Sequence, residues 1–382
     1  MRVCVTADVL GEPNNGTTLA CLNLIGHLRS AGHDVRVICG DEDRRGADGF
    51  FVVPNYKFGK LIDGYLDKNG VAIAKPDREV LEAALDGVDV CHIMTPFFLS
   101  RAVLKLCLEK NVPVTAGFHC QAENISSHAN LMNASALNNS IYHNFYAHFY
   151  KYVDAIHYPT EFIRETFERS IGRETNGYVI SNGVNEIFKK ENCPKNDHQI
   201  LFSGRYSKEK SHGTLLRAVA KSRYRDKIKL VLAGKGPRER QLGRLINKLG
   251  LKNVEMRFFT REELVGVINS SVLYVHPAKI EIEAISCLEA ISCGLVPVIS
   301  DSPRSATRAF ALTEMNTFEC DNADDLRDKI DYWFDHPEEL RRCSEQYLGF
   351  TEQFSQSACM EKMTAMLEEV IGKHEEKNVL LH

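Results

Sequence analysis

Short apolar, β-branched runs alternate with helical patterns along the whole chain, and this alternation limits the fold more than any other feature. Strands are expected at residues 2–6, 34–38, 49–53, 88–93, 112–116, 155–158 and 177–180, and in the second half at residues 199–203, 228–233, 253–258, 272–276 and 296–300. Between the first two strands, apolar residues recur at every third position from Leu19 to Leu28, which is typical of one helix face. Because strands that alternate with helices form parallel sheets, the sequence predicts an α/β fold of Rossmann-like domains.

A polar segment divides the chain into two halves. Residues 191–198 are polar, contain a proline and separate the two series of strands. A length of 382 residues also fits two domains, at roughly 150 residues each. We therefore expect an N-terminal domain over residues 1–190, a C-terminal domain over 191–350, and a C-terminal helix over 351–382. That helix has apolar residues on one side from Met360 to Val370, which favours packing back toward the first domain.

The charge balance excludes some classes of partner. With 47 basic and 51 acidic residues, the net charge is −4, which gives no overall attraction to nucleic acid or to an anionic membrane. Every apolar stretch is shorter than the ~20 residues that span a bilayer, and Asp8 interrupts the N-terminal segment before a signal-peptide core could form. We expect a cytoplasmic protein. Peripheral contact with the inner face of the plasma membrane through a local patch stays open, as does the oligomeric state.

The spacing of cysteines and carboxylates predicts no metal site. Twelve cysteines are scattered without a C-x-x-C pair, which favours free, buried thiols in a reducing compartment. Residues 41–43 form a D-x-D string flanked by Arg44 and Arg45, which we interpret as a salt-bridged turn. We therefore expect no metal and no cofactor beyond the substrates.

The loop after the first expected strand carries a glycine pattern. Gly11 and Gly16 give G-x-x-x-x-G, but Thr17 stands where a phosphate-loop lysine would follow, so an NTPase is disfavoured. The loop also lacks the G-x-G-x-x-G of dinucleotide-binding proteins. What remains is Gly16 at the start of a helix, where free N–H groups can meet a phosphate. A plain tight turn explains it equally well.

Two glycine turns follow strands of the second half. Gly204 ends the strand at 199–203, and Arg205 and Lys210 would bring two positive charges to the carboxyl edge of the sheet. A diphosphate suits such a pair, although a solvated basic loop is the alternative. Gly234 marks a second turn at the same edge, which allows a ligand to approach the backbone.

The most specific pattern is a pair of glutamates with seven residues between them. Glu281 lies in the loop before a helix that is expected to begin near Ala284, and Glu289 lies more than one turn inside it. Carboxylates accept hydrogen bonds from sugar and ribose hydroxyls, while the N–H groups around Ile285 and Ser286 suit a phosphate. This one segment could bind every part of a sugar nucleotide except the base.

Taken together, these motifs resemble retaining glycosyltransferases of family 4. The similarity rests on the E-x7-E segment with CG-x-x-PVI after it, on SGRYSKEK, ISNGV and LAGKGP, and on the helix at Gly16, in the family's order across almost the whole chain. The resemblance implies the GT-B fold, in which two Rossmann-like domains face each other across a cleft. The N-terminal domain would bind the acceptor and the C-terminal domain the nucleotide sugar.

The resemblance also implies roles for residues of the second half. Glu281 matches the residue that binds hydroxyls of the donor sugar, and Glu289 the one that binds the ribose. Arg205 and Lys210 match the basic pair that holds the diphosphate and stabilises its charge as it leaves. Residues 256–259 occupy the region expected near the nucleobase.

In the first half, the resemblance singles out Gly16 and His119. Gly16 matches the glycine whose backbone approaches the diphosphate, and His119 a histidine near the sugar and the reacting centre. A general-base role for His119 does not follow, because the leaving phosphate can take the acceptor's proton on one face. Glu283 and Ala284 stand where the family commonly has an aromatic–glycine pair, which leaves the choice of hexose open.

Two segments bear on the acceptor. Six aromatic residues gather near polar ones: Tyr142, Phe145, Tyr146, Phe149, Tyr150 and Tyr152. They suit a membrane interface or a lipid groove, or they pack on the domain core. Residues 56–62 combine apolar and basic side chains that could touch lipid head groups. Within the family, residues 281–289 and 301–308 look closer to bacterial enzymes that glycosylate diacylglycerol than to sucrose or starch enzymes.

The sequence thus predicts a hexosyltransferase that moves glucose or galactose from its uridine diphosphate, with retention, to a membrane lipid such as diacylglycerol. A polysaccharide precursor or a small alcohol is the alternative acceptor. A sugar-nucleotide-binding regulator without turnover is the alternative from a different functional class.

Overall fold

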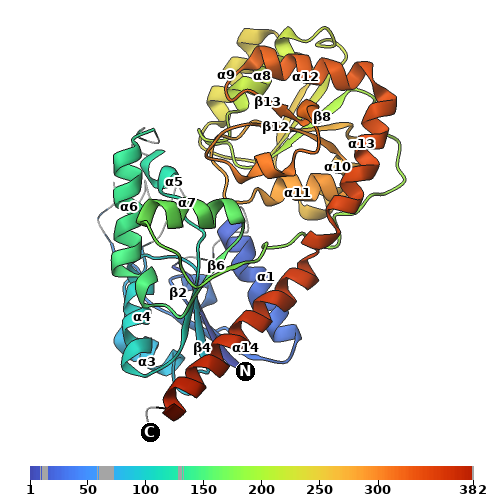
Figure 1. Ribbon diagram of the computed structural model, residues 1–382. Helices are drawn as coiled ribbons and strands as arrows, with labels where there is room; N and C mark the ends of the chain where they lie inside the picture. The colour runs from blue at the N-terminus through green and yellow to red at the C-terminus, as the bar shows by residue number, and fades with distance from the viewer. Residues whose placement is uncertain are drawn as a thin grey trace. The chain divides into compact units, whose positions relative to one another are not determined.

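The computed structural model divides the chain into two compact units, each with its own parallel sheet (Figure 1). It describes residues 1–380 apart from 9, 11–15, 58, 60–72, 128–130 and 132. The first unit contains Met1–Asn182 and Cys359–His382, and the second contains Gly183–Ala358. Residues 183–190, which the sequence assigned to the first domain, belong to the second unit because Val184 and Phe188 are buried in its core.

The first unit is built on a seven-stranded parallel sheet of order β3-β2-β1-β4-β5-β6-β7. Its strands are β1 (Arg2–Thr6), β2 (Asp34–Cys39), β3 (Phe50–Val52), β4 (Val90–Ile93), β5 (Val114–Gly117), β6 (Ala155–Tyr158) and β7 (Gly177–Val179). Its helices are α1 (Gly16–Ser30), α3 (Arg78–Ala84), α4 (Phe98–Glu109), α5 (Ala122–Ser127), α6 (Ser135–His148), α7 (Glu161–Ile171) and α14 (Gln356–Leu380), with 3-10 turns η1 (Glu42–Arg44) and η2 (Tyr150–Tyr152). All seven strands expected from the first half are present.

The long helix α14 completes the core of the first unit. Met360, Met363 and Met366 are buried in one cluster with residues of β1, β2 and α1. Figure 1 shows α14 running beside α1. The apolar side of this C-terminal helix therefore covers the sheet that the N-terminal strand helps to form.

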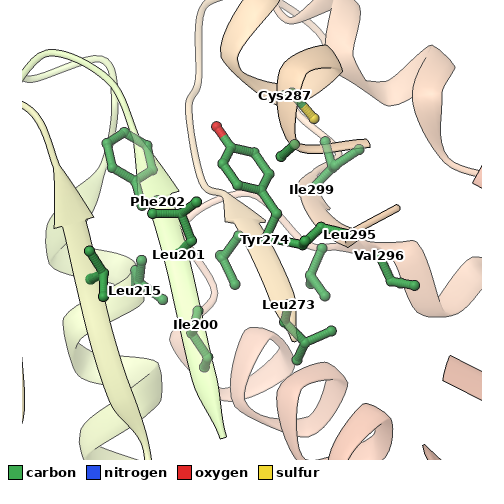
Figure 2. Packing of buried hydrophobic residues seen from close by; sticks show 14 of the residues in the cluster. Ile200, Leu201, Phe202, Leu215, Leu273, Tyr274, Cys287, Leu295, Val296 and Ile299 are labelled. Carbon is green, nitrogen blue, oxygen red and sulfur yellow. The ribbon is translucent and has the colours of Figure 1, made fainter. Parts of the chain in front are cut away.

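The second unit has a six-stranded parallel sheet of order β10-β9-β8-β11-β12-β13. Its strands are β8 (Gln199–Ser203), β9 (Lys229–Ala233), β10 (Val254–Arg257), β11 (Leu273–His276), β12 (Val296–Ser300) and β13 (Thr317–Phe318). Its helices are α8 (His212–Lys221), α9 (Glu239–Leu249), α10 (Arg261–Ser270), α11 (Ile285–Ser292), α12 (Ala323–Asp335) and α13 (Pro337–Phe350), with 3-10 turns η3 (Ala306–Phe310), η4 (Glu314–Asn316) and η5 (Glu352–Phe354). In Figure 2 the Tyr274 ring of β11 lies between Phe202 of β8 and Cys287 of α11.

The aromatic segment of the first unit belongs largely to its core. Tyr142, Phe145, Phe149 and Tyr150 are buried, and the Tyr150 ring stacks on Phe118 with centroids 5.0 Å apart. The structure thus decides between the two interpretations of these four residues in favour of core packing.

The D-x-D string forms a turn with local ion pairs. Arg45 Nε donates to the Glu42 carboxylate at 2.7 Å, and Arg44 lies 3.8 Å from Asp43. The salt-bridged turn expected from the sequence is therefore present. All twelve cysteines are free thiols. In the part of the chain that the structure describes, no group of three or more His, Cys, Asp and Glu side chains is arranged to hold a metal.

Candidate active site

Three loops of the second unit meet at one edge of its sheet. β8, β9 and β11 are parallel neighbours, so the loops that follow Ser203, Ala233 and His276 all leave from the carboxyl edge. This is the edge at which open α/β sheets bind ligands. Apart from residues 256–259, on and after β10, every residue of the second half that the sequence singled out for the donor lies on one of these loops or on the helix α11.

The two glycine turns at this edge are packed against each other. A Cβ atom on Gly234 would lie 2.1 Å from the Gly204 carbonyl oxygen, and one on Gly236 would lie 2.6 Å from the Tyr206 nitrogen. The Tyr206 N–H donates to the Lys235 carbonyl at 3.0 Å, which ties the loops together. Glycine is therefore needed here by the protein's own backbone, whether or not a ligand also approaches.

Lys210 and Glu281 form a half-buried ion pair at the same edge. The Lys210 ammonium donates to Oε1 of Glu281, and the side chains are only 17% and 11% exposed. Nε2 of His276, which is fully buried, lies 2.9 Å from the same Oε1. Burial alone would raise the pKa of Glu281, but the Lys210 charge and the His276 hydrogen bond lower this pKa to about 2. Glu281 is therefore a carboxylate at neutral pH.

Glu289 has the opposite character. Its side chain is 8% exposed, and its carboxylate lies 3.5 Å from the Arg261 guanidinium. Burial raises the pKa of Glu289 to about 7, because this one partner offsets only part of the lost hydration. The two glutamates thus combine a strongly acidic group with one that titrates near neutrality, a contrast typical of functional sites.

The helix α11 begins at this edge with an unusual backbone. Ala284, the residue before Ile285, has φ 63° and ψ 62°, in the left-handed region that glycine prefers. This is the position where the resemblance predicted a glycine. An alanine therefore holds a backbone conformation here that favours glycine.

Arg205 lies partly exposed in the loop after β8, so this loop brings two cationic side chains to the edge. In the region expected near the nucleobase, Phe258 is 52% exposed, whereas Phe259 is buried with the Arg257 guanidinium 3.6 Å from its ring centroid. Phe258 is thus an aromatic ring of this region that a base could stack on.

Gly16 and His119 lie in the first unit. Gly16 is the exposed first residue of α1, and no described atom lies within 4 Å of where its Cβ would be. The residues just before it, 11–15, are outside the described residues. His119 follows β5, with its ring 5.4 Å from His157 between centroids. Burial and the neighbouring histidines hold the pKa of His119 well below its usual range, so this imidazole is neutral.

Sequence reasoning missed Tyr274 and His276. Both are buried on one face of β11, and both are linked by hydrogen bonds to each other and to the Glu281 segment. The available signal was a histidine at the end of an otherwise apolar strand, five residues before the first glutamate.

Comparison with known protein families agrees with this geometry. A model described as Glycosyltransferase Family 4 matches residues 14–187, and one described as Glycosyl transferases group 1 matches residues 183–347. The chain belongs to glycosyltransferase family 4. It is therefore a glycosyltransferase that uses a nucleotide sugar, and its two Rossmann-like units are those of the GT-B fold.

The similar proteins of this family 4 enzyme are named for different sugar nucleotides. It is 26% identical over 350 residues to a GDP-mannose-dependent alpha-mannosyltransferase of Mycolicibacterium smegmatis, which covers 84% of this chain and 86% of the relative. Anabaena Alr3699/HepE in complex with UDP-glucose is 15% identical, with a TM-score of 0.76 over 97% of this chain and all of that one. The catalytic domain of cholesterol-alpha-glucosyltransferase from Helicobacter pylori is 46% identical and covers 42% of this chain and 99% of that one, with a TM-score of 0.41.

Proposed function

We propose that this enzyme transfers a hexose, glucose or galactose, from its uridine diphosphate to a membrane lipid such as diacylglycerol, with retention of configuration. The observation that carries the proposal is the half-buried Lys210–Glu281 pair beside the start of α11. It combines an ionised carboxylate for sugar hydroxyls with an ammonium group for a diphosphate.

The donor site follows from these charges. Glu281, held as a carboxylate, accepts hydrogen bonds from hydroxyls of the hexose. Lys210 and Arg205 bind the diphosphate, together with the N–H group at Ile285, and they stabilise the charge that grows as the glycosidic bond breaks. A phosphate contact at Gly16 stays a prediction of the family resemblance. Gly204 and Gly234 shape the loops for this contact, and Glu289 binds the ribose.

Retention is proposed from the family resemblance, and the state of Glu281 bears only on the route by which it is reached. A carboxylate bound by both Lys210 and His276 at the same oxygen, with its pKa lowered to about 2, is a weak nucleophile. We therefore favour attack by the acceptor on the face that the leaving diphosphate vacates, with a phosphate oxygen taking the acceptor's proton. His119 is neutral and is assigned a place near the sugar.

An apolar acceptor is supported by the surface of the first unit. Large exposed apolar side chains follow three strands of the seven-stranded sheet: Tyr56 follows β3, Phe97 and Phe98 follow β4, and Leu131 and Leu137 follow β5. Such residues suit an acyl chain better than a polar sugar. Among the described residues no helix is long and apolar enough to cross a membrane, and residues 58 and 60–62 of the second lipid candidate lie outside them.

GDP-mannose is the second candidate donor. The mycobacterial relative is named for this donor, and it matches 84% of this chain. A matrix of donors and acceptors decides between the candidates. Radiolabelled UDP-glucose, UDP-galactose and GDP-mannose are each incubated with diacylglycerol vesicles, with glycerol and with buffer alone. We expect label from a UDP-hexose in the organic extract, and an α linkage in the product by NMR.

Each part of the proposal can fail separately in this matrix. Label from GDP-mannose alone would overturn the UDP donor, and label in glycerol alone would overturn the lipid acceptor. A β linkage would overturn retention. If the protein binds the nucleotide but transfers no sugar in any combination of donor and acceptor, the result would favour a sugar-nucleotide-binding regulator without turnover.

A further inference from the structure

Two polar side chains of β11 lie buried behind Glu281 and have no part in the proposed function so far. Tyr274 and His276 are both fully buried, on the same face of the strand, with ring centroids 5.8 Å apart. Burying a hydroxyl and an imidazole costs stability unless their polar atoms are bonded. An apolar pair would fill the same space without that cost, so the polar pair needs an explanation.

The positions of the hydrogens can be worked out from the partners. Nε2 of His276 lies 2.9 Å from a Glu281 carboxylate oxygen, which can only accept, so Nε2 carries the hydrogen. In a neutral imidazole Nδ1 must then accept, and the Tyr274 hydroxyl at 3.1 Å is the group that donates to it. The two bonds therefore point the same way, from Tyr274 through His276 to Glu281. This arrangement fixes both the tautomer and the rotation of the imidazole.

The Tyr274 oxygen also lies close to two other parts of the donor site. It lies 3.2 Å from Oγ of Ser286, in the first turn of α11, and 3.3 Å from the carbonyl oxygen of Ser203, just before Gly204. With its one hydrogen donated to His276, the Tyr274 oxygen can accept from the Ser286 hydroxyl, whereas the Ser203 carbonyl is a close neighbour without a hydrogen bond. One buried hydroxyl thus joins the end of β11 to the start of α11. Figure 2 shows this tyrosine in the middle of the core, between β8 and α11.

We propose that Tyr274 and His276 are positioning residues that hold the Glu281 carboxylate in register with the phosphate-binding start of α11. This inference rests on the proposed role of Glu281 in binding the donor sugar. Lys210 is a flexible side chain that a bound diphosphate would attract away from Glu281. His276 is then the partner that keeps the carboxylate in place while the donor binds.

The test compares a nucleotide with its nucleotide sugar. Affinities for UDP and UDP-glucose, and for GDP and GDP-mannose, are measured by calorimetry, and transfer is measured as kcat and KM. Tyr274→Phe removes only the hydroxyl. His276→Leu removes the donor to Glu281, whereas His276→Gln keeps an amide N–H that can reach it. Tyr347→Phe is the matched control, since this buried hydroxyl donates to the Phe310 carbonyl in the same unit and touches none of these groups.

A positioning role predicts a selective loss. Tyr274→Phe should weaken nucleotide-sugar binding or lower kcat by about tenfold, the size expected for a hydrogen bond that acts on a charged group, while affinity for the nucleotide alone stays within about twofold. His276→Leu should show the same pattern more strongly, and His276→Gln should recover much of the activity. Tyr347→Phe should change neither the affinity for the nucleotide sugar relative to the nucleotide nor kcat.

Other outcomes would overturn the inference. Equal losses for nucleotide and nucleotide sugar, the same losses in Tyr347→Phe, or no loss at all would return Tyr274 and His276 to ordinary core residues. If Tyr274→Phe does not fold, the two His276 variants decide. The positioning role then requires that His276→Gln is more active than His276→Leu. Glu281→Gln separates the two proposals. Full activity in that variant defeats the proposed function, whereas a defect there beside normal Tyr274→Phe defeats the positioning role alone.

Discussion

Glu289 should make the protein less stable at neutral pH than a variant without this carboxylate. Its pKa is raised from 4.5 to about 7 by burial, so the folded protein holds the proton more tightly than the unfolded chain. Below pH 4.5 the Glu289 side chain is protonated in both the folded and the unfolded protein and does not lower the free energy of unfolding. The cost grows as the pH rises through the interval between the two pKa values and is complete above about 7.

The size of this effect follows from the width of that interval. Each pH unit between 4.5 and about 7 is worth about 1.4 kcal/mol, which gives about 3 kcal/mol at pH 8 as an upper limit. Because the side chain is only 8% exposed, little of this is lost to solvent screening. For a unit of this size the limit corresponds to a melting temperature roughly 10 °C higher in Glu289→Gln. The buried amide of Gln reduces the gain, because it also needs partners.

Calorimetric melting of the wild type and of Glu289→Gln at pH 5, 6, 7 and 8 tests this reasoning. The difference in melting temperature should widen with pH in favour of the variant. Glu345→Gln, an exposed carboxylate of α13, is the control and should track the wild type throughout. A difference that is constant with pH, or one that favours the wild type at pH 8, would refute the assignment of a buried, raised-pKa carboxylate. The variant should also bind the nucleotide more weakly, since stability here is given up for a ribose contact.

The other consequences concern packing and ligand binding. Gly234→Ala should strongly lower the melting temperature, because the new Cβ would lie 2.1 Å from the Gly204 carbonyl oxygen. Gly16→Ala should leave the melting temperature unchanged and act only on donor affinity. Equal melting temperatures for the two variants would contradict the loop packing. Phe149→Ala should cost about 3–5 kcal/mol, because the side chain is fully buried, and unchanged stability with weaker vesicle binding would restore a membrane role. UDP at a hundred times its dissociation constant should stabilise the fold by about 2.7 kcal/mol, and no thermal shift at millimolar UDP would count against the donor class.

The strands of both sheets could be predicted because their apolar runs have no other stable place than a buried parallel sheet. β13 (Thr317–Phe318) could not, since two residues give no periodicity. The aromatic residues 142–152 stayed ambiguous because a helical stripe shows that one face is apolar but not what covers it. Tertiary packing on Phe118 decided the matter for Tyr142 and Tyr150.

The donor residues were found singly but not as a network. Motifs pointed to Lys210 and Glu281 separately, 71 residues apart, and nothing in the sequence paired them. The raised pKa of Glu289 depends on burial and on Arg261, neither of which is visible in a motif. His276 was missed because a histidine at the end of a buried strand is most often structural.

The central claim is that Glu281 holds the sugar of a nucleotide-sugar donor. The most direct test is transfer of radiolabelled hexose by the wild type and by Glu281→Ala, with UDP binding and far-ultraviolet circular dichroism measured on the same samples. We predict that the variant stays folded, still binds UDP and transfers no detectable sugar. Normal transfer by the folded variant would contradict the account.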